Sequence, residues 1–214
     1  MAAFAAPAAT TTRFELAITG DDDRCPLKAR GVGSFFVRPL SRSMFAVLSD
    51  THSRSGHELV GDARETVERA DATIHAGDFT TEAALDAFHD VSERLHAVHG
   101  NSDTDAVRER LPEARTIELA GVRVALTHRQ RGGPTGLAMF GRERGADLVI
   151  SGHTHRPSVT ETDYCVLLNP GSHAEPRGNP ASHAELTPDG NGLAGEIRDR
   201  EGAVLESFRV EGRN

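Results

Sequence analysis

Tryptophan is absent from this chain of 214 residues, and tyrosine and lysine occur only once each. Proteins that bind single-stranded nucleic acids stack bases on aromatic side chains, and proteins that bind duplexes neutralise phosphates with clustered lysine and arginine. Here aromatic residues make up 5% of the sequence, and the formal net charge is −8 at pH 7. We therefore expect no stable complex with a nucleic acid.

Cysteine and long apolar runs are also scarce. The two cysteines, Cys25 and Cys165, lie far apart in the sequence, so a disulfide framework is not expected. Reduced thiols are typical of the cytosol, and a cytoplasmic location is the corresponding expectation. No run of about 18 apolar residues is present, so we expect neither a transmembrane helix nor a membrane partner.

The first 43 residues differ in composition from the rest of the chain. They carry six basic and four acidic side chains, whereas residues 44–214 carry a net charge of −10 with 18 arginines and no lysine. The start of the chain lacks the basic segment and the continuous apolar segment of a secretory signal. We interpret residues 1–43 as a weakly ordered leader and residues 44–214 as one folded domain. A further hypothesis is that translation starts at Met44.

Short apolar strands alternate with helical segments from Phe45 onward, which indicates an α/β fold. The expected helices span 59–70, 81–95, 105–111 and 135–144. The strands 45–48, 72–75 and 97–99 with the helices between them form a βαβαβ unit, whose strands pair in parallel. Segments 115–119 and 122–126 look like an antiparallel hairpin. Most of the chain after residue 157 is predicted as strand, so we expect two mixed sheets packed face to face with helices outside.

Side chains that bind metals follow five of the expected strands. The five segments are Ser49-Asp50-Thr51-His52, Ala76-Gly77-Asp78, Gly100-Asn101, Thr127-His128 and Gly152-His153-Thr154-His155. Ligands of open α/β sheets bind outside the carboxyl ends of the strands. A single pair of histidines one residue apart is as easily an exposed loop, but the recurrence of the pattern at five strand ends favours a metal site.

The donor atoms of these segments indicate which metals would bind. Asp50 and His52 lie one residue apart, so in extended backbone their side chains point to the same side. The two carboxylate oxygens of Asp78 can bridge two cations. Mixed nitrogen and oxygen donors without thiolate favour divalent ions such as Mn²⁺, Fe²⁺, Ni²⁺, Co²⁺ or Zn²⁺. Seven candidate ligands exceed the needs of one site and suffice for two sites that share Asp78.

The order of these motifs resembles that of the calcineurin-like metallophosphoesterases, in particular the compact prokaryotic phosphodiesterase (YfcE-like) branch. The matching motifs are Asp50-x-His52, Gly77-Asp78, Gly100-Asn101-x-Asp103, His128 and Gly152-His153-x-His155. The resemblance covers about residues 44–210 and implies a four-layer α/β/β/α sandwich. It implies that Asp50, His52, Asp78 and His155 hold one metal, and that Asp78, Asn101, His128 and His153 hold the other, with Mn²⁺ as the expected ion.

The activity implied by this resemblance is phosphodiester hydrolysis. A hydroxide that bridges two cations would attack phosphorus in line with the leaving oxygen. Asp78, Asn101 and His128 are the expected catalytic residues, because they hold the cations and the non-bridging phosphate oxygens. The expected substrate is a small phosphodiester that the sequence does not identify further.

Two departures from the family pattern affect the expected substrate. Larger phosphatases of the superfamily have a histidine directly after the asparagine, near the leaving group, whereas this chain has Ser102. Without a positioned general acid, substrates with good leaving groups are favoured over phosphomonoesters. The small branch commonly has a Gly-His pair after the histidine of its fourth motif, whereas the loop after His128 here carries Arg129 and Arg131, which either contact a phosphate or lie in solvent.

Several alternatives stay open from the sequence. Besides a phosphodiesterase, the sequence allows a phosphomonoesterase of the same superfamily or, as in the retromer subunit of this fold, a non-catalytic protein-interaction scaffold. Exposed sheet edges of this fold also allow a homo-oligomer. Asp103 either orients a ligating histidine or caps the helix that begins near Thr104. His75 and His99 precede two of the motifs, and core or sheet packing is the simpler interpretation of both.

Overall fold

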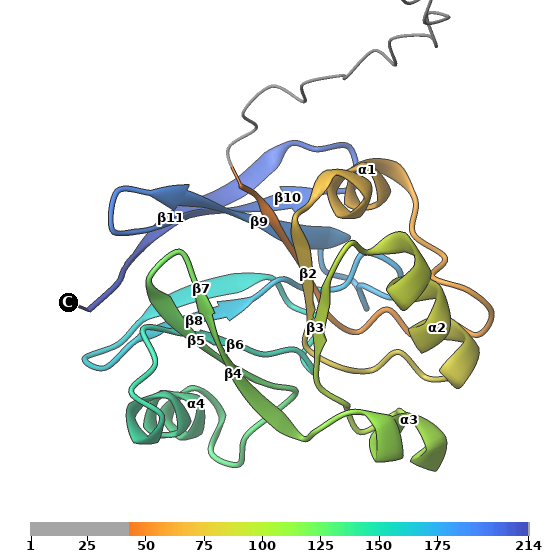
Figure 1. Ribbon diagram of the computed structural model, residues 1–214, viewed down its shortest axis with the longest axis horizontal. Helices are drawn as coiled ribbons and strands as arrows, with labels where there is room; N and C mark the ends of the chain where they lie inside the picture. Colours follow the sequence, from red (N-terminus) through yellow and green to blue (C-terminus); the bar gives the residue numbers. More distant parts are fainter. Residues whose placement is uncertain (1–42, 214) are drawn as a thin grey trace, which may run out of the picture. The chain divides into compact units, whose positions relative to one another are not determined.

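Residues 43–213 are described by the computed structural model, and within them the chain forms two β-sheets and four α-helices (Figure 1). The six-stranded sheet has the order β11-β10-β9-β1-β2-β3, and the five-stranded sheet has the order β4-β5-β6-β8-β7. The interpretation of residues 1–43 as a leader concerns, apart from Ser43, residues outside the described part. None of the described helices is long and apolar enough to cross a membrane.

The six-stranded sheet combines the predicted βαβαβ unit with three strands from the end of the chain. Its strands are β1 (Phe45–Leu48), β2 (Ala72–His75), β3 (Leu95–Ala97), β9 (Ser182–Asp189), β10 (Gly192–Asp199) and β11 (Val204–Glu211). Strands β1, β2 and β3 are parallel to one another, and β9 is antiparallel to β1. The outer face is covered by α1 (Gly61–Arg69), α2 (Glu82–Val91) and α3 (Asp105–Arg110) (Figure 1).

The five-stranded sheet begins with the predicted hairpin. Its strands are β4 (Ala114–Leu119), β5 (Val122–Thr127), β6 (Leu148–Ile150), β7 (Ser158–Glu161) and β8 (Val166–Asn169). Strands β5, β6 and β8 pair in parallel, whereas β4 and β7 are antiparallel edge strands. The outer face is covered by α4 (Gly133–Glu143), whose Phe140 packs with Val149 and Leu167.

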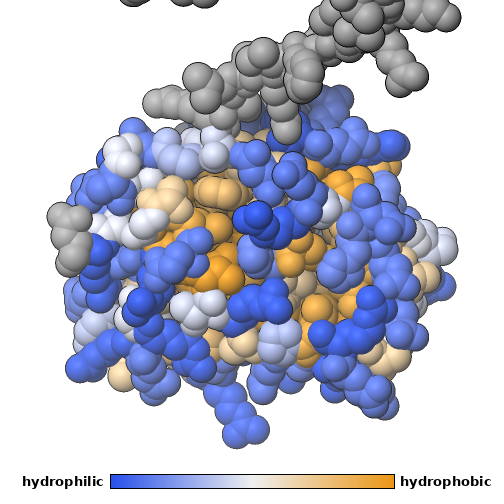
Figure 2. Space-filling view, in the orientation of Figure 1, coloured by the Kyte–Doolittle hydropathy of each residue, from blue (hydrophilic) through white to orange (hydrophobic). Residues whose placement is uncertain are grey.

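Alternation along the strands places the core between the two sheets. Val47 faces the opposite sheet, whereas its neighbours Ala46 and Leu48 face the helices, because successive side chains of a strand point to opposite faces. Burying a side chain such as Val47 or Leu126 contributes about 1.5–3 kcal/mol. Hydrophilic residues cover most of the outside in the view of Figure 2. The predicted four-layer α/β/β/α sandwich of two mixed sheets flanked by helices is therefore confirmed.

The second expected helix was predicted too long. It ends at Val91, and Ser92 adopts an extended conformation with φ −96° and ψ 133° while its N–H still bonds the carbonyl of Phe88. Leu95 instead begins β3, opposite Thr73 of β2. An apolar residue four positions after Val91 fits the helical period, but pairing with a neighbouring strand overrides that preference. The start of the helix was predicted correctly, since the Thr81 side chain accepts a hydrogen bond from the Ala84 N–H.

Candidate metal centre

The loops after five strands carry the candidate ligands, and their backbone conformation is unusual. Asp50 and His52 follow β1, Asp78 follows β2, Asn101 follows β3, His128 follows β5, and His153 and His155 follow β6. Five of these seven have positive φ: Asp50 (53°), His52 (45°), Asp78 (63°), His153 (73°) and His155 (57°). Positive φ is uncommon for residues other than glycine and marks backbone strain that clusters at functional sites. The fold therefore imposes this geometry at the strand ends.

The first group of donors consists of Asp50, His52 and His155. The Nε2 atom of His155 lies 3.3 Å from Asp50 Oδ1 and 3.3 Å from the Nε2 atom of His52. One donor atom from each of the three residues lies within 4.8 Å of the others. Two imidazole nitrogens and a carboxylate oxygen at these separations can bind one divalent cation.

The second group consists of Asp50, Asp78 and His128. The Nε2 atom of His128 lies 3.3 Å from Asp78 Oδ2 and 3.9 Å from Asp50 Oδ1. This nitrogen is buried and has no hydrogen-bond partner among the described residues. Buried polar atoms are rarely left without a partner, so the donor set fits a cation bound here.

Backbone carbonyls orient two of these histidines. The Nδ1 atom of His128 lies 2.8 Å from the carbonyl oxygen of Ala76, to which it donates a hydrogen bond. The Nδ1 atom of His155 donates in the same way to the carbonyl oxygen of Glu175. A proton on Nδ1 leaves the Nε2 lone pair of a neutral imidazole directed at the carboxylates. This is the arrangement in which protein histidines bind metals.

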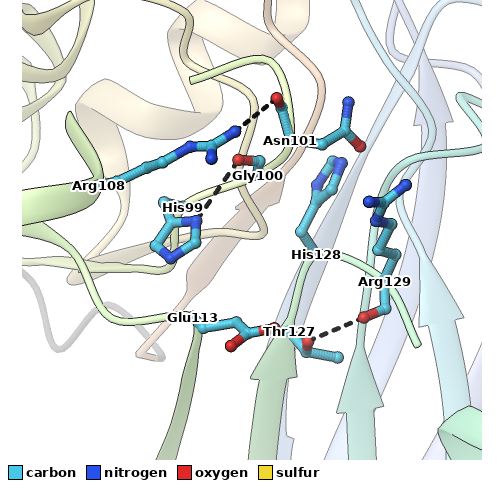
Figure 3. Close-up of a pocket in the computed structure, with 8 residues that line it drawn as sticks. All are labelled: His99, Gly100, Asn101, Arg108, Glu113, Thr127, His128 and Arg129. Atoms are coloured by element: carbon cyan, nitrogen blue, oxygen red, sulfur yellow. Dashed lines mark hydrogen bonds between the residues drawn. The ribbon is translucent and has the colours of Figure 1, made fainter. Parts of the chain in front are cut away.

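Asn101 and His153 lie on the exposed side of the centre. The ring of His153 meets the ring of His128 edge to face with a centroid distance of 5.4 Å, and its backbone N–H donates to Asp50 Oδ2 at 2.9 Å. Asn101 and His128 line the same cavity (Figure 3). The structure thus brings five of the seven predicted residues into direct contact and places these two at the open side.

Ser102 and two glycines shape the surroundings of the carboxylates. Ser102 donates to both oxygens of Asp78, from its N–H at 2.8 Å and from its Oγ at 3.0 Å. A Cβ atom on Gly100 would lie 2.0 Å from Asp78 Oδ1, and one on Gly152 would lie 2.6 Å from Asp50 Oδ2. Only glycine leaves room for these close approaches.

Asp103 has a different role from both of those expected. Its buried carboxylate accepts hydrogen bonds from the backbone N–H groups of Asp78 (3.1 Å), Gly100 (2.7 Å) and Thr80 (2.6 Å). Its carboxylate hydrogen-bonds to no ligating histidine in the described part, and it does not cap α3, which begins after Thr104 without a side-chain cap. Both expectations were wrong. Asp103 joins the loop after β2 to the loop after β3 and so fixes the position of Asp78.

His75 is fully buried and links two other loops. Its Nδ1 accepts from the Gly77 N–H at 3.2 Å, so its Nε2, 3.1 Å from the Thr51 hydroxyl, carries the proton. The ring stacks on Phe79 with a centroid distance of 3.7 Å. Burial holds the pKa of His75 well below its usual value. A neutral His75 therefore packs in the core, as the sequence favoured, and also supports the loops that carry Asp50 and Asp78.

The electrostatics of the centre favour an ionised Asp78. Burial acts to raise the pKa of Asp78, but the neighbouring His128 and the Ser102 hydrogen bonds outweigh it and hold that pKa far below its usual value. Burial raises the pKa of Asp50. For His128, burial acts to lower the pKa, and the carboxylates of Asp78 and Asp50 raise it above its usual value. A carboxylate that stays ionised while buried is suited to binding a cation.

Sequence reasoning missed two residues beside the first group. The carboxylate of Glu175 lies 3.4 Å from the Nε2 atom of His52 and is half-exposed. The hydroxyl of Ser172 donates to the carbonyl oxygen of Asp50 at 2.6 Å. Both residues lie in the irregular segment between β8 and β9, where no hydrophobic period or strand end marks them. Ser172 thus connects this segment to the backbone of a candidate ligand.

Comparison with known proteins now agrees with the geometry of the strand-end loops. Residues 44–189 match the calcineurin-like phosphoesterase superfamily domain. The chain belongs to this superfamily. A probable metallophosphoesterase of Methanothermobacter thermautotrophicus is 38% identical over 161 residues, which cover 72% of this chain and 91% of the relative. Phosphodiesterase YfcE of Escherichia coli is 32% identical over 107 residues, which cover 47% of this chain and 56% of YfcE.

Solved structures show the same fold. Vps29 of Chaetomium thermophilum superimposes with a TM-score of 0.66 at 17% identity, over 80% of this chain and all of Vps29 (100%). At this identity the likeness concerns the fold alone. Superfamily membership and the likeness to YfcE place the chain among the metal-dependent phosphoesterases, in the small prokaryotic branch, as the motifs predicted.

Proposed function

We propose that the chain hydrolyses a small phosphodiester with the help of two divalent cations, with Mn²⁺ as the expected ion. The observation that carries the proposal is the buried Nε2 atom of His128, which lies 3.3 Å from Asp78 Oδ2 and 3.9 Å from Asp50 Oδ1 and has no hydrogen-bond partner among residues 43–213. When bound, the cations supply an activated water as nucleophile and offset charge on the phosphate.

The residues of the chain have separate tasks in this proposal. Asp50, His52 and His155 hold one cation, and His128 with Asn101 and His153 holds the other, while Asp78 lies between the two sets. Ala76 and Glu175 keep the protons of His128 and His155 on Nδ1 through their carbonyl oxygens. Asn101 also donates from its amide to a phosphate oxygen and stabilises the charge that develops there.

Ser102 favours a diester over a monoester. Its hydroxyl donates to Asp78 Oδ2 at 3.0 Å, so its proton already has an acceptor. A hydroxyl in this position is a poor general acid, because its pKa is far from neutral. The leaving alcohol then departs without help from this residue, which favours substrates with good leaving groups.

Metal content and turnover test this proposal. We expect about two Mn²⁺ per chain by mass spectrometry, and Mn²⁺-dependent hydrolysis of bis-(p-nitrophenyl) phosphate well above that of p-nitrophenyl phosphate. Asp78→Asn should lower turnover by more than about a hundredfold, since even the loss of an outer partner of a metal ligand costs 10–100-fold. The matched control is Asp90→Asn, at an exposed position on α2 outside the strand-end loops, which should leave both measurements unchanged.

Two outcomes would change the proposal. Absence of bound metal together with absence of turnover in Mn²⁺, Ni²⁺ and Zn²⁺ would contradict an enzyme and leave a protein-interaction role. Faster hydrolysis of the monoester than of the diester would replace the phosphodiesterase with a phosphomonoesterase.

A further inference from the structure

A cavity of about 180 Å³ opens beside Asn101 and His128 (Figure 3). Its other lining residues include His99, Arg108 and Arg129. In Figure 3 the guanidinium of Arg129 and the ring of His128 extend in the same direction, toward the amide of Asn101. A group bound in this cavity would therefore lie next to the reacting phosphate.

Arg129 lines this cavity and two further cavities. One of them, about 620 Å³, is lined by Arg129, Arg131 and His153 together with Glu113 and Gln130. The other, about 160 Å³, lies between the segment that leads from β5 into α4 and the segment formed by the loop after β6 with β7 and β8. The exposed guanidinium of Arg129 makes no hydrogen bond or ion pair with another side chain in the described part, although residues around the centre are otherwise well connected. It is therefore available to a bound molecule.

The charge of these cavities opposes that of the protein. The chain has a net charge of −8, yet the first and the largest cavities are lined by three arginines, Arg108, Arg129 and Arg131, against one carboxylate, Glu113. Arg108 is held in place by the carbonyl oxygens of Asn101 (2.7 Å) and Asp103 (3.0 Å), which leave its charge uncompensated. A cleft lined by one sign of charge concentrates ligands of the opposite sign.

The third cavity has a different character. Pro134, Leu137 and Leu167 line it together with His128 and His153. Arg129 is its only arginine, and no carboxylate lines it. An uncharged arm of a diester fits this side of His128, and a charged arm fits the side of Arg108 and Arg129.

We propose that the substrate is an asymmetric phosphodiester, in which one arm carries a second anionic group, a carboxylate or a phosphate, and that Arg129 binds this group. The inference rests on the proposed function, because it places the scissile phosphate at the strand-end loops. A guanidinium binds carboxylate or phosphate through two parallel N–H groups, so one arginine can recognise either. Arg129 is then a specificity-determining residue next to His128.

Three p-nitrophenyl diesters that differ only in the second arm test the inference. The arms are propyl, 2-carboxyethyl and 2-phosphoethyl, and release of p-nitrophenolate by the Mn²⁺-loaded protein is measured. We expect kcat/KM to be about tenfold higher for either anionic arm than for propyl, mainly through a lower KM, since a hydrogen bond to a charged group is worth about this factor. A preference for only one anionic arm identifies its source as carboxylate or phosphate.

Variants show whether Arg129 causes the preference. Arg129→Gln should reduce the ratio of kcat/KM between anionic and propyl substrates to near one, and Arg129→Lys should restore part of that ratio. The control is Arg94→Gln, which removes an equal charge from an exposed arginine just before β3 that lines none of these cavities. Equal kcat/KM for all three arms overturns the inference, as does a fall of the anionic-to-propyl ratio in Arg94→Gln as large as that in Arg129→Gln. Either result leaves the proposed phosphodiesterase function unaffected. Absence of turnover with every diester removes the proposed function and the inference together.

Discussion

Histidine and carboxylate side chains cluster in two places in the described part of the chain, and the two clusters differ in how their charge is balanced. The strand-end cluster contains Asp50, Asp78 and His128, and the second cluster contains Asp62, His183 and Glu185 on α1 and β9. In each cluster one donor atom per residue lies within 4.8 Å of the others. Residue type and spacing alone therefore do not distinguish them.

Arginine makes the difference between the clusters. Glu185 pairs with Arg69 and lies 3.5 Å from the Nε atom of Arg198, so the chain itself supplies the positive charge. The strand-end carboxylates of Asp50 and Asp78 pair only with histidines in the described part. A histidine that binds a cation is neutral, so in the proposed metal-bound state the cation balances the negative charge of these carboxylates.

Backbone conformation separates the clusters as well. Asp62 lies in a helix, and His183 and Glu185 lie in a regular strand. Asp50 and Asp78 have φ values of 53° and 63° in loops that further hydrogen bonds hold in place. The strand-end cluster is thus maintained against a local conformational preference, whereas the second cluster results from ordinary sheet and helix geometry.

Removal of Asp103 is the strongest test of whether loop geometry makes the difference. Asp103→Ala leaves the N–H groups of Asp78 and Gly100 without an acceptor, which should lower the free energy of unfolding of the metal-free protein by about 2–3 kcal/mol. Metal affinity should fall by about 10–100-fold, as for other outer partners of metal ligands. Urea unfolding and metal titration measure the two effects. Asp105→Ala, at an exposed position on α3, is the control.

Unchanged metal affinity in Asp103→Ala would mean that the donor residues alone suffice for binding. The comparison of backbone conformation between the clusters would then lose its meaning, and only the difference in arginine content would remain.

Much of the strand-end cluster could be predicted from the sequence, because two simple rules apply there. Short apolar segments mark buried strands, and parallel strands bring their carboxyl ends to one edge of a sheet. Asp50, Asp78 and His128 each follow such a segment, so their proximity follows from topology. The same rules predicted the two sheets and the helical layers.

The remaining features depend on packing that no local pattern encodes. Glu175 reaches His52 from an irregular segment more than a hundred positions away in the sequence. Asp103 looked like a helix cap because it precedes α3, but it accepts instead from the Gly100 N–H of its own loop and from the Asp78 and Thr80 N–H groups of the loop after β2. Leu95 fits both a helical and a strand pattern, and only its pairing with Thr73 decides between them.

Lowering the pH should destabilise the folded protein through His183 of the second cluster. Burial lowers the pKa of His183, with Asp62 and Glu185 acting to raise it and Arg198 and Arg69 acting to lower it. The unfolded chain takes up a proton near the usual histidine pKa of about 6.5, and the folded chain only at lower pH. The unfolded state thus binds more protons in this pH range. The contribution of His183 to the free energy of unfolding is therefore fully present above about pH 6.5 and is lost as the pH falls below that value.

His183→Gln should reduce this loss of stability, measured as the difference in unfolding free energy of the metal-free protein between pH 7 and pH 5. Other buried histidines contribute equally in both proteins and cancel. His89→Gln, at an exposed position on α2, should leave the pH dependence unchanged. Identical pH dependence in wild type and His183→Gln would mean that the histidine of the second cluster is as easily protonated as an exposed one.

The smallest expected effect comes from converting the second cluster into a metal site. Arg69→Met with Arg198→Met removes the positive charge beside Glu185 and leaves Asp62, His183 and Glu185 as donors. Three such donors can bind Zn²⁺ weakly with water as a further ligand. Zinc at ten times its Kd would raise the free energy of unfolding by about 1.4 kcal/mol.

The effect of zinc on unfolding is best measured in an Asp78→Asn background, which weakens the strand-end site. The addition of His183→Gln should abolish the stabilisation by zinc. Absence of any zinc effect in the double arginine variant would show that the strand-end cluster differs from the second cluster by its strained loops and not by its lack of arginine.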